Sequence, residues 1–225
     1  MKKHLPNLLT SVNVFFGALA TVAVLGGRVA DSVIFIAVSL AADFLDGLVA
    51  RALKVSGPLG KELDSLADMV SFGMFPGALA YWLLRQTAWA HWAWVGFIIT
   101  VFSAWRLAKF NLDTRQEQYF IGLPTPANTM FFLGMGAAYV REASFRQFLQ
   151  AHVWALAAVI GVMSVLLVAE VPMLSLKIKF FSLRENWRIV VLVGGALLLL
   201  WWLPLSYFLF AVILWYLLWS LVAGR

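Results

Sequence analysis

The 225-residue chain is 63% hydrophobic and only 12% charged, with a mean hydropathy of +0.88. This is more apolar surface than a soluble domain of that length can bury, so the composition predicts an integral membrane protein. The net charge of +6 comes from lysines and arginines spread over short loops, which argues against nucleic-acid binding. The absence of cysteine excludes disulfides and thiolate metal sites.

Apolar runs long enough to cross a bilayer follow one another along the chain. They lie at about residues 8–25, 32–50, 64–84, 92–110, 126–140 and 152–170, and two more fit within 189–223. Pro204, near the middle of the last stretch, favours two short helices over one long span. We therefore expect an all-α polytopic membrane fold, with a six-helix core over residues 1–170 and a C-terminal transmembrane hairpin over residues 171–225.

The basic residues predict how the chain is oriented, because cytoplasmic loops carry an excess of lysine and arginine. Of the 17 basic residues, 13 fall on one side of the expected spans, and these are Lys2, Lys3, Arg51, Lys54, Lys61, Arg106, Lys109, Arg115, Lys177, Lys179, Arg184, Arg188 and Arg225. The remaining four are Arg28, Arg85, Arg141 and Arg146. Both termini, and the loop expected over residues 51–63, should therefore face the cytoplasm.

Eight residues around that loop stand at fixed offsets, and they are Asp43, Asp46, Gly47, Ala50, Arg51, Gly60, Asp64 and Asp68. The first four share one face of a helix, and the last two share a face of the next helix. Two antiparallel helices, joined by about a dozen residues with Ser56-Gly57-Pro58 as the turn, would bring the four carboxylates together. A single aspartate is often a helix cap and a single glycine often serves helix packing, but neither reading explains eight positions with fixed gaps.

The clustered carboxylates predict a metal site. An intramembrane carboxylate costs several kcal/mol unless it is paired or bound to a cation. Hard divalent ions prefer carboxylate oxygens, so we expect Mg²⁺ or Mn²⁺ here. Two ions about 4 Å apart are the arrangement that such a cluster supports when a phosphoryl group is the substrate.

The segment from Ala42 to Gly73 resembles the signature of the CDP-alcohol phosphotransferases, and no signature position departs from it. These membrane enzymes transfer a phosphoalcohol or phosphatidyl group from a CDP-linked donor and release CMP. The resemblance extends over about the first 170 residues, and it implies a catalytic core and a homodimer. It implies that the metal ligands are Asp43, Asp46, Asp64 and Asp68, the last also being the general base. It also implies that the donor's nucleotide and phosphates contact Gly47, Ala50, Arg51 and Gly60.

Polar residues on the first helix add to the expected donor site. Asn7, Thr10 and Asn13 recur at intervals of three on one helical face, so they can line the pocket with hydrogen-bonding groups. Contacts between helices explain the same spacing equally well. We take Asn7 and Thr10 as candidate donor-binding residues.

Three further segments resemble the integral-membrane phosphatidylserine synthase branch of the family, and they are Leu5–Asn13, Arg106–Asn111 and Tyr119–Asn128. The Gly-Leu-Pro-x-Pro element at residues 122–126 discriminates best, although the Ala-Asn-Thr that follows it departs from the usual small residues. The resemblance implies serine as the acceptor, whose carboxylate needs a cation. The candidate acceptor or phosphate-binding residues are Arg106, Lys109, Asn111, Pro124 and Asn128. Anchoring at the positive side of the membrane is the other explanation of the two basic residues, and a simple helix start is the other explanation of Pro124.

The resemblance thus implies an enzyme that transfers the phosphatidyl group of CDP-diacylglycerol to L-serine, giving phosphatidylserine and CMP, with Asp68 as general base. A bacterial inner membrane is the expected location. Within the same reaction class, glycerol-3-phosphate or an inositol phosphate could be the acceptor, or an archaeal ether lipid could be the donor. A cation transporter is the alternative from another class. It is disfavoured because all four aspartates gather at one face of the membrane.

Overall fold

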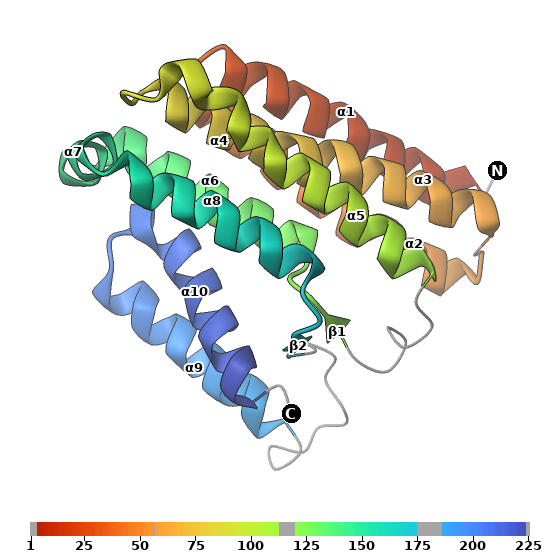
Figure 1. Ribbon diagram of the computed structural model, residues 1–225. Coiled ribbons are helices and arrows are strands. Elements are labelled where there is room, and N and C mark those ends of the chain that lie inside the picture. Colours follow the sequence, from red (N-terminus) through yellow and green to blue (C-terminus); the bar gives the residue numbers. More distant parts are fainter. Residues whose placement is uncertain (1–3, 56, 113–119, 175–185, 224–225) are drawn as a thin grey trace.

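Helices make up nearly all of the computed structural model, which describes residues 4–55, 57–112, 120–174 and 186–223 (Figure 1). The helices in chain order are α1 (Leu5–Leu25), α2 (Val29–Leu53), α3 (Pro58–Asp68), α4 (Phe75–Arg85), α5 (Ile98–Leu112), α6 (Thr125–Arg141), α7 (Ala143–Ala151), α8 (Val153–Val168), α9 (Trp187–Trp202) and α10 (Leu205–Ala223). A π-helical turn, η2 (Met69–Met74), joins α3 to α4, and a 3-10 helix, η3 (Ala90–Phe97), leads into α5. Each of the eight apolar runs found in the sequence lies on a helical segment.

Four helical segments of the described chain are long and apolar enough to cross a membrane alone, and they are Leu5–Leu25, Val29–Leu53, Ala90–Leu112 and Leu205–Ala223. A fifth is obtained if α7 and α8, which bend by 89° relative to each other, count as one span. Helices α6 and α9 are shorter, with 17 and 16 residues. The prediction of an all-α polytopic membrane protein is confirmed, although fewer helices pass this test than the eight spans expected.

The connection between α2 and α3 is shorter than the sequence analysis expected. Helix α2 continues to Leu53 and closes at Lys54, which adopts the left-handed conformation with φ of 51°. Helix α3 begins at Pro58, whose fixed φ and missing N–H suit the first position of a helix. The loop predicted over residues 51–63 is therefore wrong, because residues 54–57 alone join the two helices.

Some residues used in the sequence analysis lie outside the described residues, namely Lys2, Lys3, Ser56, Arg115, Tyr119, Lys177, Lys179, Arg184 and Arg225.

A small antiparallel strand pair, which the sequence did not predict, lies beside the helices. Strand β1 (Phe120–Ile121) pairs with β2 (Pro172–Met173), so the connection into α6 is tied to the connection that follows α8. Gly122 follows β1 with φ of +77°, and a Cβ there would lie 2.8 Å from the carbonyl oxygen of Leu167. Only glycine fits this turn, because other residues resist positive φ and have no room for a side chain.

The C-terminal hairpin packs on the rest of the bundle through α10 (Figure 1, blue). A Cβ on Gly134 of α6 would lie 2.5 Å from the backbone nitrogen of Phe210, so the two helices approach very closely. Ser206, at the start of α10, donates a hydrogen bond of 2.5 Å to Oε1 of Glu142. Helix α9 contacts mainly α10, and the break at Pro204 between them agrees with the sequence prediction.

Candidate active site

Three aspartates from two helices converge at the end of the bundle where α2 finishes and α3 starts. Asp43 of α2, and Asp64 and Asp68 of α3, each offer a carboxylate oxygen, and these oxygens all lie within 4.8 Å of one another. Helices α2 and α3 both pack against α1 and face each other across it, and the four-residue spacing puts Asp64 and Asp68 on one face of α3. The structure thus assembles a carboxylate cluster from residues up to 25 positions apart in the sequence.

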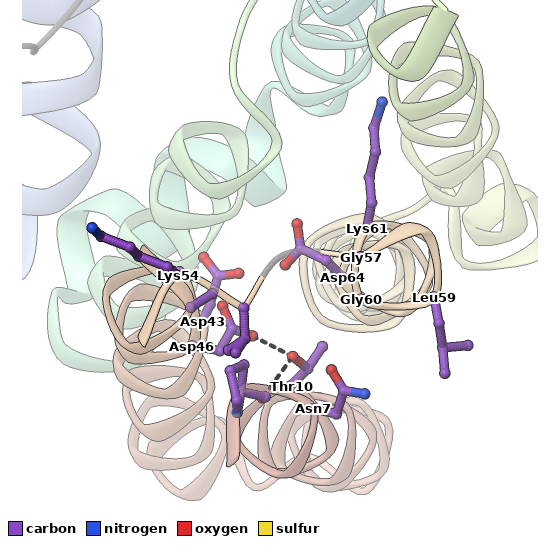
Figure 2. A pocket seen from close by; sticks show the side chains of 14 residues that line it. Asn7, Thr10, Asp43, Asp46, Lys54, Gly57, Leu59, Gly60, Lys61 and Asp64 are labelled. Carbon is purple, nitrogen blue, oxygen red and sulfur yellow. Dashed lines mark hydrogen bonds between the residues drawn. The ribbon is translucent and has the colours of Figure 1, made fainter. Parts of the chain in front are cut away.

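Asp46, the fourth aspartate, stands beside this cluster and is held by α1. Its side chain is buried, and the hydroxyl of Thr10 donates a hydrogen bond of 2.6 Å to its Oδ2. Figure 2 shows Asp43 and Asp46 on one side of the cavity and Asp64 facing them from α3. One Asp46 oxygen is thereby oriented by α1.

The residues fit a divalent cation on two grounds. The donor set is made of carboxylate oxygens, which Mg²⁺ and Mn²⁺ prefer. Within the described part of the chain, Oδ1 of Asp68 is buried and has no hydrogen-bond partner. Buried carboxylate oxygens are rarely left without a partner, and a cation would satisfy this one.

A cavity of about 650 Å³ opens beside the carboxylates. Asn7, Thr10, Gly47, Ala50 and Gly60, all candidates from the sequence, line it together with Asp43, Asp46 and Asp64. Packing does not require the two glycines, because an added Cβ would lie 3.6 Å from its nearest neighbour at either position. The two glycines therefore leave space in the cavity. This supports a role in ligand binding for them and argues against a role in helix packing.

The basic residues near the cavity are partly different from those expected. Arg51 is exposed at the end of α2 and does not line the cavity, whereas Lys54 and Lys61 do. In Figure 2 the Lys61 side chain extends away from Asp64, and its Nζ lies 3.3 Å from the carbonyl oxygen of Asn111. The sequence analysis used both lysines only to orient the chain. Their positions close to the glycines and aspartates of the motif were the available signal.

Arg106 of α5 is buried close to Asp68 and does not line the cavity. Its side chain is 7% exposed, it interacts electrostatically with Asp68, and its Nη1 donates a hydrogen bond of 3.3 Å to Oγ1 of Thr125. Its guanidinium also lies 5.5 Å from the ring centroid of Phe110. Burying an arginine without an ion pair is costly. Arg106 is therefore not an ordinary surface anchor.

Asn128 lies fully buried near the start of α6. Among the described residues, neither its Oδ1 nor its Nδ2 has a hydrogen-bond partner, and the same holds for Nε of Arg106. Such buried donors and acceptors are uncommon in the absence of a ligand or water. The region of Arg106, Thr125 and Asn128 therefore has free hydrogen-bonding capacity for a small polar molecule.

The other acceptor candidates lie elsewhere. Lys109 is exposed on α5. Asn111 donates a hydrogen bond of 2.8 Å to Oγ of Ser65 and so links α5 to α3. Pro124 is half-buried and precedes the first residue of α6 as its N-cap. Arg106 is thus bonded to Thr125, which shares a face of α6 with Asn128 three residues later, whereas Lys109 is exposed.

A buried polar contact below the cavity was not recognised as part of the site. Ser39 of α2 donates a hydrogen bond of 2.5 Å to Oδ1 of Asn13, and Ser71 of η2 donates one of 3.0 Å to the Asn13 carbonyl. The spacing contained the signal, because Asn13 is three residues from Thr10, Ser39 is four from Asp43, and Ser71 is three from Asp68. These side chains connect α1 to α2, which carries Asp43 and Asp46, and to η2, which directly follows Asp68.

The helix that carries Asp68 changes geometry directly after it, in η2. Pro76 has no N–H for the carbonyl of Phe72, four residues earlier, and Oγ1 of Thr129 lies 3.1 Å from that oxygen. Thr100 donates a hydrogen bond of 3.0 Å to the next carbonyl, that of Gly73. Hydroxyl groups from α6 and α5 thus bond to carbonyls of η2 and tie the segment after Asp68 to these two helices.

The chain is similar to a protein-family model and to several known proteins. The family model described as CDP-alcohol phosphatidyltransferase matches residues 3–168. A CDP-diacylglycerol--serine O-phosphatidyltransferase of Bacillus subtilis (strain 168) is 32% identical over 140 residues, which are 60% of this chain and 77% of that protein.

Proteins of the same name from two other organisms are similar. The one from Saccharomyces cerevisiae is 36% identical over 148 residues, covering 59% of this chain and 53% of that protein. The one from Mycobacterium bovis is 32% identical over 180 residues, covering 75% of this chain and 60% of that protein. The alignments thus span between about half and three quarters of the relatives' own length.

Proposed function

Because the chain belongs to the CDP-alcohol phosphatidyltransferase family, we propose that it transfers the phosphatidyl group of CDP-diacylglycerol to L-serine, giving phosphatidylserine and CMP. One observation carries the proposal. The oxygens of Asp43, Asp64 and Asp68 meet within 4.8 Å beside a cavity of about 650 Å³ that small residues keep open. The names of the similar proteins support serine as the acceptor.

The donor would occupy the cavity between α1, α2 and α3. Its cytidine lies against Gly47, Ala50 and Gly60, with Asn7 and Thr10 as hydrogen-bonding partners on α1. Lys54 and Lys61 add positive charge at the rim, where the diphosphate enters. Many large apolar side chains are exposed on the helices, as expected for a protein whose substrate arrives through the lipid.

Asp43, Asp46, Asp64 and Asp68 would hold two Mg²⁺ or Mn²⁺ ions. When bound, the ions would neutralise the diphosphate of the donor and stabilise charge on the leaving group. The orphaned oxygen of Asp68 and the all-carboxylate donor set support this assignment. Thr10 would not contact a metal itself, but its hydrogen bond would orient the carboxylate of Asp46 as a metal ligand.

The transfer itself requires a base and a bound acceptor. Arg106 and Asn128 bind serine, the guanidinium taking its carboxylate. Asp68 accepts the proton of the serine hydroxyl, and the serine oxygen then attacks the phosphorus that bears the diacylglycerol. The bond from that phosphorus to the oxygen of CMP breaks, and CMP leaves with the electron pair. Arg106 interacts electrostatically with Asp68, so acceptor and base are neighbours.

The location and assembly follow from the same proposal. The cavity lies at the end of the bundle where the basic residues Lys54 and Lys61 gather, so it faces the cytoplasm of a bacterial inner membrane. The homodimer stays a prediction from the family resemblance.

CMP release by the purified chain in detergent tests this function. CDP-diacylglycerol and Mg²⁺ or Mn²⁺ are supplied with serine, glycerol-3-phosphate or an inositol phosphate, each in a separate reaction. We expect release that depends on serine and stops when the metal is chelated. Release with another acceptor would overturn serine and retain the reaction class. No release with any acceptor would reopen the cation transporter.

A further inference from the structure

Helix α10 lies outside residues 3–168, the part of the chain that the family model matches, yet it contacts a peptide segment close to Arg106. The two transmembrane helices that end the chain could simply stabilise the bundle. The hydrogen bonds of α10 indicate a more specific contribution.

Two side chains of α10 clamp the backbone of Leu174. The hydroxyl of Tyr216 donates a hydrogen bond of 3.2 Å to the Leu174 carbonyl, and the Leu174 N–H donates one of 3.2 Å to Oγ of Ser220. Ser220 is fully buried and Tyr216 is 9% exposed. The four-residue spacing places both side chains on the same face of α10. Together they bond to both backbone polar groups of Leu174, its N–H and its carbonyl, in the connection between α8 and α9.

The clamp continues into the segment that leads to α6. Leu174 directly follows β2, which pairs with β1. Just beyond β1, the Gly122 N–H donates a hydrogen bond of 2.9 Å to the carbonyl of Val171, and the Leu123 N–H donates one of 2.9 Å to that of Leu166. This backbone network fixes the start of α6.

Thr125, the first residue of α6, accepts the hydrogen bond from Arg106. Tyr216 also interacts electrostatically with Arg106. Tyr216 is therefore linked to the acceptor side by hydrogen bonds through the strand pair, and its phenol lies close enough to Arg106 for the two groups to interact electrostatically.

We propose that α10 is part of the acceptor site, with Tyr216 and Ser220 as positioning residues that hold the β1–β2 pair and through it the Thr125–Arg106 contact. This inference rests on the proposed function. It assigns a part in acceptor recognition to α10, which lies outside the residues that the family model matches. The clamp acts on how the acceptor's carboxylate is bound, whereas the carboxylate cluster and the donor cavity are built from α1, α2 and α3 without it.

The matched pair Ser220→Ala and Ser206→Ala tests this. Both substitutions remove a buried or partly buried serine hydroxyl from α10, but Ser206 bonds to Glu142 at the opposite end of the helix. The full-length variants are purified, and the KM for serine, the KM for CDP-diacylglycerol and kcat are measured. We expect Ser220→Ala to raise the serine KM about fivefold and Ser206→Ala to change it less than about twofold. The donor KM should stay within about twofold in both.

Tyr216→Phe is the second variant, because it keeps the ring and removes only the hydroxyl. It should also raise the serine KM about fivefold. Thermal stabilisation by CDP reports whether each variant is folded, and if Ser220→Ala does not fold, Tyr216→Phe decides. Equal serine KM values in Ser220→Ala, Tyr216→Phe and Ser206→Ala would overturn the inference. If the unaltered chain uses another acceptor, the proposal of serine is wrong but the inference about α10 is still testable. The KM values of the three variants are then compared for that acceptor.

Discussion

The two halves of the site differ in how they are built. The carboxylate half comes from α1, α2 and α3, which follow one another in the chain, and it lies open to a cavity of about 650 Å³. The half around Arg106 comes from α5, α6 and α10, is closed, and holds buried polar atoms that have no partner within the described chain. Under the proposed function, the donor would bind in a preformed open cavity, whereas the acceptor would bond to the unpartnered groups of Arg106 and Asn128.

Asp68, which lies between the two halves, should show the largest effect. Asp68→Asn removes the proposed base and a metal ligand, so kcat should fall by about 10³-fold. Asp31→Asn is the matched control, since Asp31 is a half-buried residue of α2 that pairs only with Arg28, at 3.5 Å, in the described structure. Turnover of purified Asp68→Asn at the level of Asp31→Asn would remove Asp68 from the mechanism.

Arg106→Met tests the closed half. Loss of the buried guanidinium should raise the serine KM about 100-fold, because the acceptor's carboxylate loses its charged partner. Lys109→Met, on the same helix but with an exposed side chain, should change this KM by less than about twofold. Steady-state kinetics with varied serine measures both. An equal effect of the two substitutions would mean that general positive charge, and not the buried site, attracts the acceptor.

Gly47→Ala tests the open half. The added methyl group has 3.6 Å to its nearest neighbour, so the fold should tolerate it while the cavity narrows. The KM for CDP-diacylglycerol should rise about 20-fold, with the serine KM little changed. Gly161→Ala is the control, because a Cβ there meets nothing within 4 Å. If Gly47→Ala has the same KM for CDP-diacylglycerol as the unaltered chain, the cytidine does not bind against this face of α2.

The smallest effect is expected at the contact behind Asp46. Thr10→Val removes the hydroxyl that bonds to Asp46 and keeps the shape of the side chain. The Mn²⁺ concentration needed for half-maximal activity should rise about tenfold. Thr21→Val makes the same change on the same helix, where the hydroxyl bonds only to the Gly17 carbonyl, at 3.1 Å, among the described residues. Identical metal titrations for the two variants would contradict a role for Asp46 in metal binding.

The sequence predicted the open half well because its information is local. The aspartates and small residues lie within one helix pair, where helical spacing alone determines which side chains share a face. The loop length was nevertheless wrong, since Pro58 starts α3 earlier than the apolar pattern suggested. A proline at the first helical position was a signal that the hydropathy pattern did not include.

The closed half could be predicted only in part. Arg106 and Asn128 were found through resemblance, but their burial and missing partners depend on how α5, α6 and α10 pack. The clamp on Leu174 joins residues more than 40 positions apart, and two-residue strands have no periodicity to detect. Gly122 was taken as part of an acceptor element, whereas its turn and its approach to Leu167 already explain why a glycine stands there.

Formation of the lipid product tests the central claim most directly. Isotope-labelled serine is supplied to the purified chain with CDP-diacylglycerol, with and without Mg²⁺ or Mn²⁺, and the lipid fraction is analysed. We expect labelled phosphatidylserine and an equal amount of CMP, both lost on chelation and both absent in Asp68→Asn but present in Asp31→Asn. Metal-independent labelling, or CMP release without label in the lipid, would contradict transfer to serine at the carboxylate cluster.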